Sequence, residues 1–155
     1  MQFTLVPSND VQQLIMILRD ADEDVERIIS AVEDNANASY LALDDNKCVG
    51  AIVMHWYPEE SEILYIAIDK AQRGRGYGKA CIALIRAEAR NRRVHSLVVG
   101  TANSSLDNIA FYQKCGFRMD SIRKGYFSYL PAPVYEDGIL MHDMLVLRAA
   151  IPAPE

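Results

Sequence analysis

The amino-acid sequence predicts one α/β domain, in which helices pack against a sheet of strands. Residues 62–68 are hydrophobic on both faces, and a strand of this kind is normally buried in the middle of a sheet. A glycine-rich loop and a helix follow it, and a further strand, residues 94–100, comes after that helix. A right-handed crossover would place the two strands parallel to each other. The 155 residues suit a single domain, and they contain no internal repeat or linker.

The composition excludes several classes of protein. The chain has 16 Lys and Arg against 21 Asp and Glu, a formal charge of −5, which disfavours non-specific binding of nucleic acid. No apolar run approaches the roughly 18 residues that a membrane span needs, and the first residues lack the basic start of a signal peptide. We therefore expect a cytoplasmic protein with no membrane partner. Three cysteines without a CxxC pair and three scattered histidines predict neither a disulfide framework nor a metal site.

The first part of the chain is expected to contain a strand, two helices and a hairpin. Residues 3–7 alternate as a short strand. Asp10 then caps a helix whose apolar residues recur at helical spacing, and Gln13 is placed to close a capping box. A second helix is predicted over residues 22–32. Two strands joined by a connection of four or five residues then form a hairpin, residues 39–43 and 48–56.

The second part of the chain is expected to alternate strands and helices. Ser104, with Asp107 three residues later, forms a capping box that opens a helix ending at Gly116. The central strand alternates between two apolar faces, with Leu64, Ile66 and Ile68 on one and Ile63, Tyr65 and Ala67 on the other. The other elements are a helix over residues 79–92, two closing strands over 117–127 and 139–147, and a proline-containing loop over 128–138.

The loop after the central strand has the features of an anion-binding site. Three glycines alternate with Arg75 and Tyr77 directly before a helix, where backbone N–H groups and the helix dipole favour a phosphate. The alternative is a glycine turn that only starts the helix. A nucleotide-binding Walker loop would need glycine at Arg73 and a hydroxyl residue at Ala80. A dinucleotide fingerprint would need a small residue at Lys79 or at Cys81 and an acid after the next strand, so NAD is also disfavoured.

Two segments of the sequence resemble one family. Residues 73–78, Arg-Gly-Arg-Gly-Tyr-Gly, resemble the R/Q-x-x-G-x-G/A loop of the GNAT superfamily of acetyl-CoA-dependent N-acetyltransferases. Residues 109–117 are similar to the end of that family's last helix, with Tyr112, Lys114 and Gly116-Phe117 in the expected places. The resemblance implies a GNAT fold with a mixed sheet of about seven strands, splayed at the cofactor site, and about four flanking helices. It also implies one acetyltransferase domain over residues 1–148 and a flexible tail over 149–155.

The resemblance assigns acetyl-CoA as the co-substrate and a set of residues that bind it. In the family the sheet opens beside the central strand, whose backbone pairs with the pantetheine arm, which here implies Ile66, Ala67 and Ile68. Many members carry asparagine seven residues before the tyrosine of the last helix. This chain has Ser105 there and Asn103 nearby, so either could bind the cofactor arm. The loop that binds the pyrophosphate would comprise Arg73, Gly74, Arg75, Gly76, Tyr77, Gly78 and Lys79.

The same resemblance implies direct transfer of the acetyl group to a primary amine of a small molecule, peptide or protein. Tyr112 would protonate the departing thiolate, although a tyrosine on a helix can also be a core residue. Glu62, at the start of the central strand, is the favoured general base, with His55 and His142 as lesser candidates. A backbone N–H near Ala67 would polarise the acetyl oxygen.

The sequence determines the acceptor substrate and the oligomeric state less closely than the cofactor. Aromatic residues in and before the proline-containing loop, Tyr126, Phe127, Tyr129 and Tyr135, could form a pocket wall or a contact in a homodimer. An alternative function is a non-catalytic sensor or partner module that binds acyl-CoA on the same fold. A third possibility, acetylation of aminoacyl-tRNA, is disfavoured by the net charge despite the outward arginines at positions 86, 90, 92 and 93.

Overall fold

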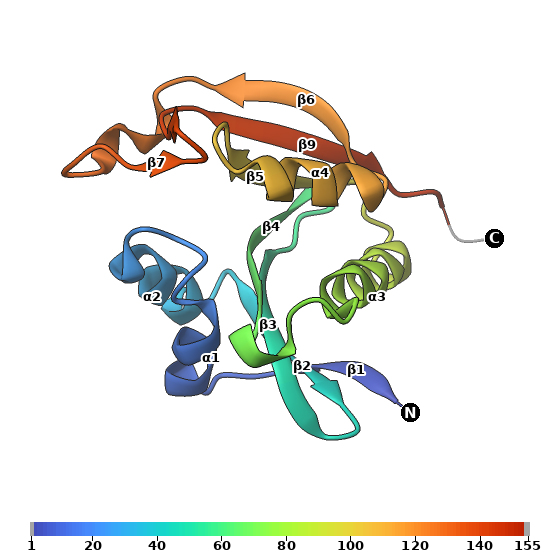
Figure 1. The fold of residues 1–155 in the computed structure, drawn as a ribbon. Helices are drawn as coiled ribbons and strands as arrows, with labels where there is room; N and C mark the ends of the chain where they lie inside the picture. The colour runs from blue at the N-terminus through green and yellow to red at the C-terminus, as the bar shows by residue number, and fades with distance from the viewer. Residues whose placement is uncertain (1, 154–155) are drawn as a thin grey trace.

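The computed structural model describes residues 2–153, which form one mixed sheet with helices on both faces (Figure 1). Seven strands follow the order β1-β2-β3-β4-β5-β9-β6, and β4 and β5 are parallel, so the predicted mixed sheet with a central parallel pair is confirmed. The strands are β1 (Phe3–Pro7), β2 (Ala38–Asp44), β3 (Lys47–His55), β4 (Glu60–Ile68), β5 (Ser96–Ala102), β6 (Arg118–Arg123) and β9 (Met144–Ala150). A separate hairpin consists of β7 (Tyr135–Glu136) and β8 (Ile139–Leu140).

Four α-helices cover the two faces of this sheet. The helices are α1 (Val11–Leu18), α2 (Val25–Glu33), α3 (Tyr77–Asn91) and α4 (Leu106–Lys114). One buried cluster joins α1 and α2 to β2 and β3, and the largest cluster joins α3 and α4 to the other face, so the fold has three layers (Figure 1). Two short 3-10 helices, η1 (Lys70–Gln72) and η2 (Tyr126–Tyr129), lie in loops. Within residues 2–153 no helix is long and apolar enough to cross a membrane.

The local structure of the first part follows the sequence with three differences. Asp10 caps α1 by accepting from the backbone of Gln13 (3.2 Å), but the backbone N–H of Asp10 donates to Ser8 rather than to Gln13, so the capping box is not closed. The second helix begins at Val25 instead of residue 22, because Asp24 is its cap. The hairpin connection has two residues, 45 and 46, both with positive φ, which is typical of a tight two-residue turn.

The central strand contains a β-bulge that the alternation of its residues does not reveal. Met54 of β3 lies opposite Ile63 and Val53 lies opposite Tyr65, so Leu64 is an extra residue in β4. The bulge turns Ile63 toward the α3 face, where Ile66 also packs, and Leu64 toward the α1 face. The predicted faces were therefore wrong for these two residues. Because a bulge bends its strand, β4 diverges from β5 at this point.

The last part of the chain differs most from the sequence prediction. Ser105 is the cap residue of α4, and no hydroxyl caps the helix, so the capping box at Ser104 is wrong. The strand predicted over 139–147 is divided into β8 and β9. Residues 149 and 150 complete β9, and Ile151 is buried with its backbone N–H bonded to His95, so the predicted tail over 149–155 starts too early. Residues 154–155 of that tail lie outside the described residues.

Candidate active site

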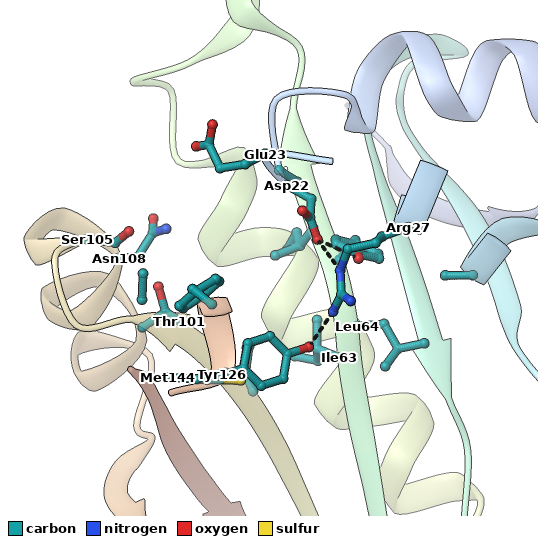
Figure 2. Close-up of a pocket in the computed structure, with 18 of the residues that line it drawn as sticks. Asp22, Glu23, Arg27, Ile63, Leu64, Thr101, Ser105, Asn108, Tyr126 and Met144 are labelled. Atoms are coloured by element: carbon teal, nitrogen blue, oxygen red, sulfur yellow. Dashed lines mark hydrogen bonds and ion pairs between the residues drawn. The ribbon is translucent and has the colours of Figure 1, made fainter. Parts of the chain in front are cut away.

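A cavity opens where the two parallel strands separate. The pairing of β4 with β5 runs from Glu60 and Ser96 to Ile63 and Val99 and ends there. The cavity has a volume of about 650 Å³ and is walled by β4, β5, α4, η2 and the loop between α1 and α2 (Figure 2). It is the size of a small-molecule site. The bulge at Leu64 and the parting of the strands therefore create the site.

The backbone of β4 beyond the bulge has free groups on the side of β5. The N–H of Asp69 donates to the carbonyl of Val49 (2.8 Å), which makes them a hydrogen-bonded pair of the β3–β4 ladder. Because hydrogen-bonded pairs alternate along an antiparallel ladder, Ala67 also pairs with β3, whereas Ile66 and Ile68 direct their backbone groups to the gap. The carbonyl of Ile68 accepts from Arg73, which leaves its N–H free there. Ile66 and Ile68 thus suit the predicted pairing with a ligand. The backbone groups of Ala67 itself face β3, so they do not suit that pairing, and the N–H groups near Ala67 that face the gap are those of Ile66 and Ile68.

The glycine loop presents free backbone N–H groups beside the site. Gly76 is the cap residue of α3 with φ +83°, and Gly74 has φ +80°, both in the left-handed region that glycine tolerates. Residues 77–79 begin the helix, so their N–H groups have no helical acceptor. Ala80 makes the first helical bond, to the carbonyl of Gly76. The dipole of a 15-residue helix adds to the attraction for an anion at this end.

Side chains of the same loop have mixed roles. The guanidinium of Arg73 donates to the carbonyl of Ile68 (3.1 Å), which holds the loop against the end of β4. Tyr77 turns inward, where its hydroxyl donates to Asp44 (2.5 Å) and its ring stacks on Phe3. Tyr77 can therefore serve a ligand only through its backbone. Arg75 and Lys79 remain exposed and available to an anion.

Tyr112 of α4 is buried but lines the cavity. Its side chain is 6% exposed, and its ring makes edge contacts with the rings of Phe111 and Phe117. Within residues 2–153 its hydroxyl has no hydrogen-bond partner, and it is open to the cavity. Burial raises the pKa of Tyr112, with a smaller contribution from Cys115. The phenol is therefore protonated at neutral pH and able to donate its proton.

Glu62 reaches the same cavity from β4. Its side chain is 28% exposed, and the nearest cation, a guanidinium nitrogen of Arg123, is 4.0 Å away. Burial raises the pKa of Glu62, while Arg123 lowers it less. A carboxylate with a raised pKa is a better proton acceptor than an exposed one. Neither His55 nor His142 lines the cavity: His55 bonds to Asn37, and His142 pairs with Asp143.

The two candidates near the start of α4 are both engaged with other residues. Asn103 lies outside the cavity lining, and its amide bonds to three backbone groups of residues 140–143, so it holds a loop and is not free for the cofactor. Ser105 does line the cavity, with its hydroxyl donating to Glu136 (2.7 Å). Asn108 also lines the cavity, and the sequence analysis had not placed it there (Figure 2).

Asp22 organises the opposite wall, and sequence reasoning missed it by treating it as the start of a helix. Its carboxylate is only 10% exposed and accepts from the hydroxyls of Tyr65 (2.8 Å) and Tyr129 (3.1 Å). Arg27 lies 3.4 Å from the same carboxylate and donates to the hydroxyl of Tyr126 (2.7 Å; Figure 2). Residues far apart in the sequence meet here, so no local pattern could have indicated the network.

Of the four predicted aromatic residues, two form the cavity wall. Tyr126 and Phe127 line it, and Tyr129 packs beneath the guanidinium of Arg27, 4.1 Å from its ring centre. Tyr135 is 63% exposed and does not line the cavity. Among the described residues no group of three or more His, Cys, Asp or Glu could hold a metal ion.

Removing the Asp22 carboxylate is expected to destabilise the fold. In Asp22→Ala, two tyrosine hydroxyls and the Arg27 guanidinium lose their acceptor, which should lower the free energy of unfolding by about 2–4 kcal/mol. Asp20→Ala is the matched control, because its side chain is 61% exposed in the same loop and its loss should cost less than about 0.5 kcal/mol. Urea unfolding measures both, and equal losses would show that the network contributes nothing.

Comparison with known proteins identifies the family. Residues 10–117 match the family model described as "Acetyltransferase (GNAT) family". The chain is 27% identical over 143 residues to YvbK, an uncharacterized N-acetyltransferase of Bacillus subtilis, with 90% of this chain and 89% of that protein covered. A GNAT family acetyltransferase from Elizabethkingia anophelis, solved with acetyl-CoA bound, is 32% identical with a TM-score of 0.86 and coverage of 96% and 97%. An IAA acetyltransferase from Bacillus cereus is 30% identical with a TM-score of 0.84 and coverage of 96% and 99%. The chain therefore belongs to the GNAT family of acetyltransferases, as its glycine loop and last helix predicted.

Proposed function

We propose that this protein transfers an acetyl group from acetyl-CoA to a primary amine by direct attack while both substrates are bound. One observation carries the proposal. The cavity between the parted strands holds a protonated, unpartnered phenol, Tyr112, and a carboxylate with a raised pKa, Glu62. A proton donor and a proton acceptor in one cavity are what acyl transfer to an ammonium requires.

The residues present fit acetyl-CoA, which supplies an acyl group on a sulfur leaving group when it is bound. Both backbone groups of Ile66 and the N–H of Ile68 face the gap beside β5 and suit the amide-containing pantetheine arm. The free N–H groups of residues 77–79, with Arg75 and Lys79, suit the pyrophosphate. The presence of acetyl-CoA in the similar Elizabethkingia protein supports this assignment.

Glu62 and Tyr112 each carry out one of the proton transfers. An amine is protonated at neutral pH, so Glu62 accepts the proton that the acceptor must lose before its nitrogen forms the new bond to carbon. Tyr112 donates its proton to the sulfur as the carbon–sulfur bond breaks, and the second proton that the newly acylated nitrogen must lose restores the phenol. A free N–H of β4, at Ile66 or Ile68, is placed to donate to the acetyl oxygen as negative charge develops there.

A thermal melt with and without acetyl-CoA tests the proposal. A ligand that binds only the folded state, at a hundred times its Kd, adds about 2.7 kcal/mol of stability, which raises the melting temperature. We expect this increase, together with thiol release that depends on an added amine. A shift in melting without thiol release for any amine would instead favour the non-catalytic acyl-CoA-binding module. No shift with any acyl-CoA would contradict both functions.

A further inference from the structure

The cavity is lined by many more acids than bases. Among the described residues six carboxylates line it, and the guanidinium of Arg27 is the one basic side chain that does. Arg27 does not neutralise the negative charge of the other carboxylates, because it is held between Asp22 and the rings of Tyr126 and Tyr129. Asp20 is faced by Arg73 at 4.0 Å. The carboxylates are Asp20, Asp22, Glu23, Glu26, Glu62 and Glu136.

Glu136 is the most firmly held of the carboxylates that lack a cation. It is half-buried on β7, and its Oε1 accepts from the hydroxyls of Ser104 (3.0 Å) and Ser105 (2.7 Å). Ser104 is completely buried, so it fixes the carboxylate in place. Within residues 2–153 the second oxygen, Oε2, has no protein donor. A carboxylate with one oxygen anchored and the other open at a cavity wall is suited to bind an ammonium group.

Carboxylates lie on both sides of the cavity. Glu23 and Glu26 come from the α1–α2 region, whereas Glu136 lies beside the start of α4. In Figure 2, Glu23 projects from its loop toward the side where Ser105 and Asn108 lie. Glu23 and Glu26 are exposed and have no cation within 4.0 Å among the described residues. Acids around a concave surface create a negative potential that concentrates cations and repels anions.

Two further side chains of the cavity wall have hydroxyl groups that a polar ligand can reach. The side chains of Thr101 and Tyr112 are 7% and 6% exposed, and both line the cavity. Within the described part of the chain neither hydroxyl has a hydrogen-bond partner. Both hydroxyls are open to the cavity: that of Tyr112 is assigned to the departing sulfur, and that of Thr101 is left for another polar group of a bound molecule.

We propose that the acceptor is an amine with at least two positively charged nitrogens and no carboxylate, such as a linear diamine or polyamine. This inference rests on the proposed acetyl transfer. One nitrogen reacts beside Glu62, and Glu136 binds a second ammonium group farther along the same molecule. Glu23 and Glu26 add to the attraction without a fixed contact, which suits acceptors of more than one length.

Acceptor panels matched in chain length test the inference. Rates of thiol release are measured for linear α,ω-diamines, each with the alkylamine and the ω-amino acid of equal length. For the best diamine, kcat/KM should exceed that of its alkylamine by about tenfold and that of its amino acid by more, and added salt should reduce the advantage. An alkylamine or amino acid that reacts equally well or better would overturn the inference and leave the acetyltransferase function intact.

A substitution at Glu136 tests whether this residue causes the preference for a diamine over an alkylamine. Glu136→Gln keeps the shape and still accepts from both serines, but it loses the charge, so the ratio of kcat/KM for diamine over alkylamine should fall about tenfold through KM. Glu33→Gln, an exposed glutamate outside the cavity, should leave the ratio unchanged. An unchanged ratio in Glu136→Gln would overturn the assignment of the second ammonium to this residue.

Measurements of amine binding distinguish a failure of this inference from a failure of the proposed transfer reaction. The diamine and the alkylamine are titrated calorimetrically into the protein in the presence of CoA. Tighter binding of the diamine without turnover would support the recognition of a second ammonium and contradict the transfer reaction. Equal or undetectable binding of both amines, with no turnover, would overturn the inference.

Discussion

Glu62→Gln is expected to lower kcat/KM for the amine acceptor by about 10²- to 10³-fold, the range found when a general base is removed. Glutamine has nearly the same size and can still accept a hydrogen bond, but it cannot take a proton from an ammonium group. The position of Glu62 in the cavity, with its nearest cation 4.0 Å away, leaves the carboxylate free for this role. Steady-state thiol release at several amine concentrations measures the change.

The pH dependence of the same variant distinguishes a base from a structural residue. Burial raises the pKa of Glu62, so in the unmodified protein its active, ionised form is lost as pH falls through that raised pKa. The rate should therefore bend downward at that pKa in the native protein. In Glu62→Gln this bend should be absent, and the rate should instead follow the fraction of neutral amine, which falls steadily with pH. Glu59→Gln, directly before the same strand, 80% exposed and outside the cavity lining, should keep the native profile. If Glu62→Gln kept the rate and the pH profile of the native protein, another group or a water molecule would be the base.

The order of the elements and the phosphate-binding end of the site could be predicted from sequence, because both depend on local patterns. The two-faced apolar strand and the three glycines before a helix need only neighbouring residues for their interpretation. The bulge at Leu64 could not be predicted, since it exists only relative to the partner strand β3. The difference at Ala67 has the same origin: which backbone groups are free depends on the pairing of β4 with β3 and not on the residues of β4.

The acceptor end escaped prediction because it is built from long-range contacts. Asp22 meets Tyr129 across 107 residues, and Glu136 meets Ser105 across 31. Asn103 shows the converse, since its position near the last helix suggested a role with the cofactor, but its amide holds residues 140–143. The residues proposed to recognise the acceptor therefore depend on neighbours that become apparent only in the folded chain.

Tyr112→Phe is expected to lower kcat by about 10²-fold while leaving acetyl-CoA binding and stability nearly unchanged. Its phenol is the one proton donor that this mechanism assigns to the departing sulfur, and burial raises its pKa, so it stays protonated across the working pH range. Because the hydroxyl has no partner within residues 2–153, its removal breaks no protein hydrogen bond. The ring contacts with Phe111 and Phe117 remain in phenylalanine.

These properties allow the catalytic and the core role of Tyr112 to be separated. Thiol release gives kcat, the acetyl-CoA melt gives binding, and urea unfolding gives stability, each compared with Tyr57→Phe, an exposed tyrosine outside the cavity. Reduced kcat with native binding and stability would establish the proton donor. A native kcat would remove Tyr112 from the mechanism, because a buried hydroxyl that neither bonds to the protein nor affects turnover has no step left to perform. Lost stability would assign Tyr112 to the core, since only a disturbed ring packing could cause it.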